Sequence, residues 1–166
     1  DAEQLLSVLS LFAEGDPNGN GKMDEIPLLL VGPWEAKWLM HAFGLIANEY
    51  HVCLGEEGRV AYVPLEAGYY DFLEYVKRLH DRGLINGDAF RQTHTLLEMT
   101  EKEVTQPRVG GMVSFAPYTL LEMDTAVQFD AVPPLVHGGK QVYRDFTGPV
   151  WRGTFAITTA CKDPAA

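Results

Sequence analysis

The chain has 166 residues, of which 46% are hydrophobic and 22% charged, and its net charge is -10. This is the balance of a globular domain that can bury a substantial core, and it excludes a mainly disordered chain. The acidic surface repels phosphate backbones, which argues against nucleic acid as the main partner, and no apolar run approaches the roughly 18 residues of a membrane span.

The first half of the chain alternates helical and extended patterns. Apolar side chains at helical spacing predict a first helix that ends before Gly15, and residues 34–46 repeat that spacing. By this register, Trp38 is expected to lie in the core. Short apolar runs predict a strand and then a β-hairpin, over residues 26–31, 52–54 and 60–63.

The second half continues the alternation. Residues 69–79 show the clearest amphipathic spacing, and Gly83 follows them as a helix end. A further helix is predicted from Asp88 to about Met99, and Gly138-Gly139 predicts a hairpin turn. Strands are predicted over residues 109–115, 129–132 and 154–158. This alternation of strands and helices indicates a layered α/β fold.

The polar loop between the first helix and the first strand carries the strongest chemical signal. Side chains at loop positions 1, 3 and 5 can converge on one point, Gly21 at position 6 permits a sharp turn, and Lys22 at position 7 offers its backbone carbonyl. Calcium prefers such a set of oxygen ligands. The loop 16–25 therefore predicts a Ca²⁺ site held by Asp16, Asn18, Asn20, Lys22, Asp24 and Glu25.

The loop departs from an EF-hand at its end. Position 12 is Pro27, where an EF-hand has a bidentate Glu, so Glu25 would have to close the ligand shell. Pro27 also blocks a standard second helix, which makes a single structural calcium a better hypothesis than a calcium sensor. The alternative is a solvated Asn/Gly turn without an ion, since these residues suit turns for local reasons.

The other reactive side chains form no catalytic or transition-metal motif. The histidines lack HExxH or His-x-His spacing, and no GxSxG, P-loop or GxGxxG occurs. Cys53 and Cys161 lie far apart in the sequence, and whether they pair is left open. Glu122 and Asp124 supply carboxylates, but no spacing singles out an acidic pair for glycoside hydrolysis.

Several stretches resemble family 1 extracellular solute-binding proteins, the substrate-binding lipoproteins of bacterial ABC sugar importers. FAEGDPNGNGKMDEIPL (12–28) resembles the calcium loop of that family, and HAFGL (41–45) is similar to the helix end that follows it. Residues 59–86 resemble a hairpin and long helix of the family, and residues 153–166 are similar to a strand followed by the short motif that opens the next helix. Together these stretches cover most of the chain in a fixed order.

The resemblance implies a type II periplasmic-binding-protein fold, in which two α/β lobes close on the ligand. Residues 1–166 would then be a single domain, a partial lobe with the calcium loop 16–25 inserted. The resemblance further implies a non-catalytic protein that holds a structural Ca²⁺, binds a carbohydrate or related polar solute and delivers it to ABC permease subunits. The protein would be extracellular, either lipid-anchored at the cell surface or periplasmic.

Ligand contacts are predicted from sugar chemistry, because sugar-binding clefts stack sugar rings on aromatic faces. Their places near loops favour four side chains, with packing as the alternative for each: Trp34, Tyr118, Trp151 and Arg152. Two rival functions remain. One is a glycoside hydrolase fragment, and the other is a dockerin-like calcium-dependent adhesion module, which normally duplicates a loop that occurs once here.

Overall fold

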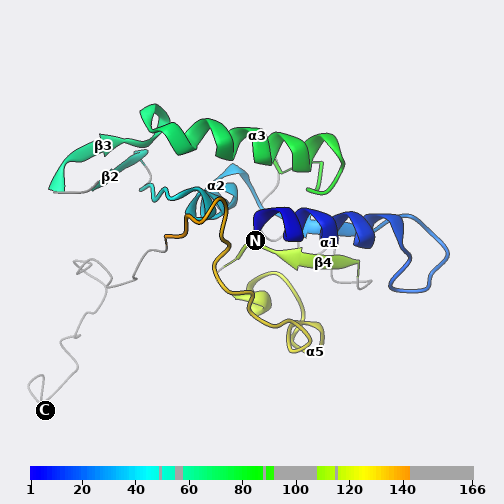
Figure 1. Ribbon diagram of the computed structural model, residues 1–166. Coiled ribbons are helices and arrows are strands. Elements are labelled where there is room, and N and C mark those ends of the chain that lie inside the picture. Colours follow the sequence, from blue (N-terminus) through cyan, green and yellow to red (C-terminus); the bar gives the residue numbers. More distant parts are fainter. Residues whose placement is uncertain (49, 55–57, 88, 92–107, 115, 143–166) are drawn as a thin grey trace, which may run out of the picture.

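The computed structural model describes residues 1–48, 50–54, 58–87, 89–91, 108–114 and 116–142. The strand predicted at 154–158 and most of the helix predicted from Asp88 lie outside these residues, as do Trp151, Arg152 and Cys161. Figure 1 shows two long helices packed with a small sheet, a hairpin at one end and a polar loop at the other. None of the helices in the described part of the chain has the length and apolar character to cross a membrane.

Helix α1 (Ala2–Glu14) is the first helix that the apolar periodicity predicts. It begins at a capping box, in which the Asp1 carboxylate accepts a hydrogen bond from the Gln4 amide at 2.8 Å. Leu6 and Leu9 are buried on its inner face. The helix ends before Gly15, as predicted, and the polar loop follows at that end.

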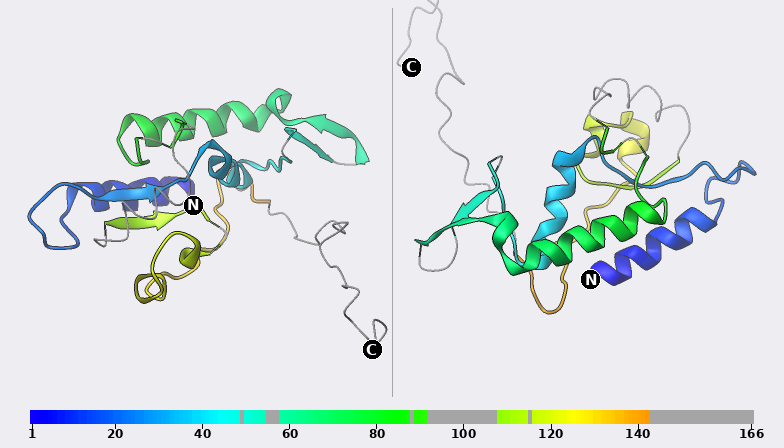
Figure 2. Two further views of the ribbon diagram at one scale, coloured as in Figure 1. Left: turned by 180° about the vertical axis from the view of Figure 1, so that it is seen from behind. Right: turned by 90° about the horizontal axis from the view of Figure 1, so that it is seen from above.

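Helix α3 (Ala67–Asp81) is the predicted amphipathic helix, and Gly83 follows it at φ 67°, the left-handed conformation that favours glycine. The helix lies beside α1 in both views of Figure 2. The buried hydroxyl of Tyr75 donates a hydrogen bond to the carbonyl of Ala2 at 2.7 Å. Burial raises the pKa of Tyr75, so the phenol stays protonated and links the two helices.

The sheet is built on strands β1 (Ile26–Leu29) and β4 (Val109–Met112), which pair in parallel. The sequence predicts both strands, although each is shorter than its predicted range, and β4 is mostly half-buried. Leu28 also forms a parallel bridge with Ile85, so the segment after α3 extends the sheet on the other side of β1.

Two apolar clusters lie on opposite faces of β1. Leu28 and Leu30 belong to the larger cluster, together with the buried faces of α1 and α3. Leu29 points to the smaller cluster, with Leu120 and Leu121. Because successive side chains of a strand face opposite sides, β1 is covered on both faces. This is the layered α/β arrangement that the element order predicts.

The helix predicted over residues 34–46 forms as two shorter pieces. Helix α2 (Pro33–Ala36) continues into the 3₁₀ helix η1 (Lys37–Phe43), and Gly44 ends it at φ 78°. The predicted core position of Trp38 is wrong. Its neighbour Leu39 is buried together with Phe43, whereas Trp38 is 38% exposed on the face that also carries Trp34.

The predicted hairpin forms from strands β2 (Val52–Leu54) and β3 (Val60–Tyr62), which pair antiparallel. The 3₁₀ turn η3 (Val63–Leu65) leads from the hairpin into α3. His51, directly before β2, has φ 58°, a left-handed conformation that is unfavourable for a residue with a side chain.

The strand predicted at 129–132 is wrong. The chain there is irregular, and it follows the 3₁₀ turn η4 (Pro117–Thr119) and the short helix α5 (Met123–Ala126). Phe129 packs against the smaller apolar cluster, but Val132 is 72% exposed. A strand needs a face that is buried along its length, and this stretch has none.

The turn predicted at Gly138-Gly139 is confirmed. Both glycines have positive φ, 56° and 77°, as a two-residue hairpin turn of the primed type requires. His137 and Lys140 exchange both backbone hydrogen bonds across it, at 3.0 and 2.9 Å.

The ion pair between α1 and α3 predicts a pH-dependent part of the stability. The Arg78 guanidinium donates two hydrogen bonds of 2.7 Å to the Glu3 carboxylate, which lowers the pKa of Glu3 against the opposing effect of burial. The contribution is therefore present above the unfolded-state pKa and is lost as the pH falls through the lower folded-state pKa. The side chains are 44% and 49% exposed, so solvent screening limits the effect to about 0.5–1 kcal/mol.

We expect Glu3→Gln to remove this part of the acid dependence when urea unfolding is measured between pH 7 and pH 3. In 1 M NaCl the two proteins should converge, because salt screens exposed charges. An unchanged acid profile in Glu3→Gln at low salt would contradict the assignment.

Candidate functional site

The acidic loop between α1 and β1 is the first candidate site. The Asp16 carboxylate accepts hydrogen bonds from the amides of Asn20 and Gly21, at 3.0 and 2.7 Å. The side-chain oxygen of Asn18 accepts a second bond from the Asn20 amide, and that of Asn20 accepts one from Lys22. These local bonds give backbone N–H groups of the loop a side-chain acceptor, as Asp and Asn do in turns.

Glu25 is the unusual member of this loop. Both of its carboxylate oxygens are shielded from solvent, and neither has a hydrogen-bond partner in the described part of the chain. A carboxylate that has lost its water without gaining a donor or a cation is strongly unfavourable. A bound cation at the end of the loop would supply the missing partner.

The donor set of the loop fits calcium by its chemistry, since the side chains offer oxygen and the ion prefers oxygen ligands. Within the described residues, however, no three His, Cys, Asp or Glu side chains are gathered into a metal-ligand group. A loop of this kind also depends on asparagine and backbone carbonyl oxygens. The shielded, unpartnered carboxylate of Glu25 is an energetic penalty that the metal-free loop leaves uncompensated.

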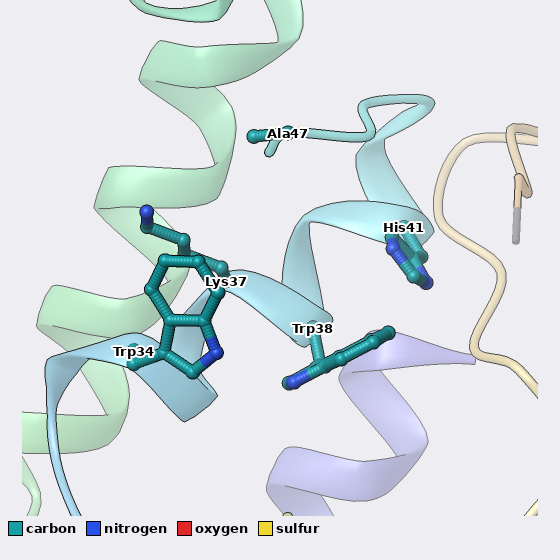
Figure 3. A pocket seen from close by; sticks show the side chains of 5 residues that line it. All are labelled: Trp34, Lys37, Trp38, His41 and Ala47. Atoms are coloured by element: carbon teal, nitrogen blue, oxygen red, sulfur yellow. The ribbon is translucent and has the colours of Figure 1, made fainter. Parts of the chain in front are cut away.

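A shallow, open pocket on α2 and η1 is the second candidate site. It is lined by Trp34, Lys37, Trp38, His41 and Ala47. Figure 3 shows the two indoles as neighbours, with the Lys37 side chain over one and His41 beside the other.

Aromatic and cationic groups set the chemistry of this pocket. The Lys37 ammonium lies 4.1 Å from the centre of the Trp34 ring, a cation–π distance. The Trp38 and His41 rings meet edge to face, with centroids 5.4 Å apart. Trp34 and Trp38 are 48% and 38% exposed, so both present aromatic surface on which a sugar ring can stack.

The sequence-predicted ligand residues are not all brought to this pocket. Trp34 forms part of its wall, whereas Tyr118 is 59% exposed on η4 and does not line it. Trp151 and Arg152 lie outside the described residues.

Four lining residues besides Trp34 were missed as site residues, although the sequence contains a signal for three of them. Trp34, Lys37, Trp38 and His41 follow each other at intervals of three, one and three residues, which places them on one face of a helical segment. Their shared face could have been recognised as an aromatic and basic stripe. Of these residues only Trp38 was assigned to the core, because aromatic residues at helical spacing usually pack there. Lys37 and His41 were not proposed as site residues.

Comparisons with known proteins show which class of protein this fold resembles. No protein-family model matches the chain. FusA, the fructooligosaccharide ABC transporter substrate-binding protein of Streptococcus pneumoniae, is 36% identical over 91 residues, which are 53% of this chain and 17% of FusA.

Solved structures agree with the sequence match. FusA in complex with kestose superposes with a TM-score of 0.72 at 27% identity, covering 84% of this chain and 28% of FusA. A FusA EF-hand mutant in complex with fructo-nystose gives a TM-score of 0.71 at 25% identity, covering the same fractions of the two chains. An extracellular solute-binding protein from Bifidobacterium longum subsp. infantis shares the fold, with a TM-score of 0.60 at 20% identity over 72% of this chain and 26% of that protein.

The chain is homologous to the substrate-binding proteins of ABC transporters, and its fold is that of a partial lobe of a solute-binding protein. Among the proteins compared, the resemblance in sequence and in structure is to FusA. The resemblance seen in the sequence is thereby confirmed. The chain spans less than a third of the length of these relatives.

Proposed function

We propose that this chain is part of the substrate-binding protein of an ABC importer, which binds an oligosaccharide and delivers it to permease subunits. The observation that carries the proposal is the match to FusA in both sequence and fold, since two solved FusA structures hold fructooligosaccharides. Residues 1–166 would form one partial lobe. The whole protein would act outside the cytoplasmic membrane, either lipid-anchored or periplasmic.

The proposed protein performs no chemistry on the sugar. The match to the substrate-binding protein FusA supports this reading over a glycoside hydrolase, which would need two carboxyl groups beside the scissile bond. The dockerin-like alternative is disfavoured by the match to solute-binding proteins, which extends well beyond the loop.

Trp34 is the sugar-stacking residue of this proposal, with Trp38 as its neighbour. Both indoles line the same pocket and are partly exposed. Lys37 covers one face of Trp34, so a sugar ring would use the remaining aromatic surface or displace the ammonium. Tyr118, Trp151 and Arg152 stay predictions for the rest of the cleft.

Sugar binding tests the proposal. We expect the full-length protein to bind kestose or nystose in calorimetry and to release no reducing sugar from either. Trp34→Ala should weaken binding by about tenfold or more, because loss of a stacked aromatic ring removes roughly 1–3 kcal/mol. Tyr50→Ala is the control, since Tyr50 is 71% exposed and does not line the pocket. Turnover of the sugar, or equal binding by the Trp34 variant, would contradict the proposal.

The loop 16–25 is proposed to hold one structural Ca²⁺ through Asp16, Asn18, Asn20, the Lys22 carbonyl, Asp24 and Glu25. The unpartnered carboxylate of Glu25 supports this proposal, and so does the related FusA structure described as an EF-hand mutant. When bound, the ion would neutralise acidic side chains and brace the loop between α1 and β1. It would lie at a distance from the aromatic pocket and take no part in sugar contacts.

Removal of calcium should destabilise the protein. At a calcium concentration 100-fold above the dissociation constant, binding adds about 2.7 kcal/mol to the free energy of unfolding. We expect a chelator to lower the melting temperature of the unaltered protein and to have little effect on Glu25→Gln, which keeps the shape but not the charge. Asp130→Asn, which removes one exposed acidic charge outside the loop, should respond like the unaltered protein. Equal melting temperatures with and without a chelator would contradict the proposed calcium site.

A further inference from the structure

Arg108 holds the exit of the acidic loop from two sides. Its backbone carbonyl, directly before β4, accepts a hydrogen bond from the amide of Ile26 at 2.8 Å. Its guanidinium Nη1 donates to the carbonyl of Asp24 at 3.4 Å and lies 3.7 Å from the Asp24 carboxylate oxygen Oδ2. A residue 84 positions away in sequence is thereby in contact with a predicted calcium ligand.

The two acidic residues at the loop exit differ in their surroundings. The other carboxylate oxygen of Asp24 accepts a hydrogen bond from the Asn20 side chain at 3.1 Å, so both Asp24 oxygens face donors or a cation. Glu25, the next residue, has no partner for either oxygen in the described part of the chain. Arg108 therefore supplies a positive charge beside the Asp24 carboxylate, whereas the negative charge of the Glu25 carboxylate has no compensating partner in the described part of the chain.

The contact between Arg108 and Asp24 is partly protected from solvent. The side chains are 24% and 26% exposed, and salt and water screen such a pair less than a fully exposed one. A cation that enters the loop would meet a carboxylate already attracted to a guanidinium. It would have to weaken this contact or bind beside a resident positive charge, and either effect is unfavourable to calcium binding.

We propose that Arg108 is a positioning residue that holds the metal-free loop in place through Asp24 and thereby lowers the calcium affinity of the loop. The proposal rests on the proposed calcium site. It assigns to Arg108 two linked effects: greater stability of the metal-free protein, and a weaker grip of the loop on the ion.

Calcium calorimetry and melting curves on the full-length protein test this role. Arg108→Met should bind Ca²⁺ about three- to tenfold more tightly than the unaltered protein, and its metal-free form should melt at a lower temperature. The difference in melting temperature with and without calcium should therefore widen. Arg108→Gln, which keeps an amide donor but no charge, should shift in the same direction, so the test does not depend on a single variant. Arg108→Lys keeps the charge and should stay within about twofold of the unaltered affinity.

Arg59→Met is the charge-matched control, because Arg59 is an exposed residue of the hairpin segment at the other end of the molecule. It should leave the calcium affinity unchanged. Equal or weaker calcium binding by both uncharged Arg108 variants would overturn the role of Arg108 and leave the calcium site intact. Absence of calcium binding by the unaltered protein would overturn the site, and with it this inference.

Discussion

Replacement of Asn86 by alanine is expected to lower the free energy of unfolding by about 2–4 kcal/mol, a large effect for a side chain that is not fully buried. The Asn86 amide makes two hydrogen bonds to Leu30: its oxygen accepts the backbone N–H at 2.8 Å, and its nitrogen donates to the carbonyl at 2.9 Å. Leu30 is completely buried. The alanine variant would leave a buried donor and a buried acceptor without partners, which is more unfavourable than the loss of an exposed bond.

Urea unfolding of Asn86→Ala and Asn86→Asp measures this effect. The aspartate variant keeps the acceptor for the Leu30 amide but places a negative charge against its carbonyl, so it should be destabilised as well. Gln128→Ala is the matched control, because the Gln128 side chain makes one exposed hydrogen bond, to the carbonyl of Asp124. We expect the control to change stability by less than about 0.5 kcal/mol. If the alanine variant were as stable as this control, water or a rearrangement would have to replace the lost hydrogen bonds to the backbone of Leu30.

The Asn86 contact also has a consequence for the pocket. Leu30 ends the run that begins with β1, and Gly32 then starts α2, which carries Trp34. The Glu35 carboxylate accepts a hydrogen bond of 2.9 Å from the backbone N–H of Gly32, which fixes the start of this helix. A loosened Leu30 should therefore alter the exposure of Trp34, and acrylamide quenching of tryptophan fluorescence should rise in Asn86→Ala.

Gly68→Ala is expected to destabilise the protein by about 1–3 kcal/mol, the usual range for overpacking a core position. A Cβ atom at Gly68 would lie 2.6 Å from the carbonyl oxygen of Phe43. That oxygen belongs to the backbone at the end of η1, so it cannot move away by a side-chain rotation. The packing of α3 against η1 would have to open instead.

Gly87→Ala is the control for this prediction, because a Cβ there meets no atom within 4 Å. Thermal melting of the two variants separates steric overlap from the general effect of adding a methyl group. The Gly87 variant should melt within a few degrees of the unaltered protein, and Gly68→Ala clearly below it. Equal melting temperatures would mean that α3 and η1 can move apart at little energetic cost.

The two candidate sites lie at opposite ends of β1. The acidic loop enters this strand at Ile26, and the segment that leaves it leads to Trp34 within a few residues. The strand is held by β4 on one side and by the Ile85–Asn86 segment on the other. This arrangement places the proposed metal where it would brace the sheet, and the proposed sugar contacts at the opposite end of the strand.

Local patterns in the sequence determined the features that depend on neighbouring residues. Apolar spacing predicted α1 and α3, and Gly138-Gly139 predicted a tight turn, because helix faces and turn conformations are set within a few residues. The spacing of the oxygen-bearing residues in the loop 16–25 is likewise a local signal, and the calcium site that it indicates stays a prediction.

Contacts between distant residues were decided by the tertiary structure alone. The amide of Asn86 pairs with Leu30 from 56 residues away, and Arg108 reaches Asp24 across 84 residues, so no local pattern announces either contact. Trp38 was placed in the core from its helical spacing, but the packed elements bury the face of Leu39 and Phe43 and leave Trp38 exposed. The strand predicted at 129–132 fails for a similar reason, because no described element covers a face of it and Val132 stays exposed. Periodicity shows which side chains share a face, but the elements packed against that face decide whether it becomes core or binding surface.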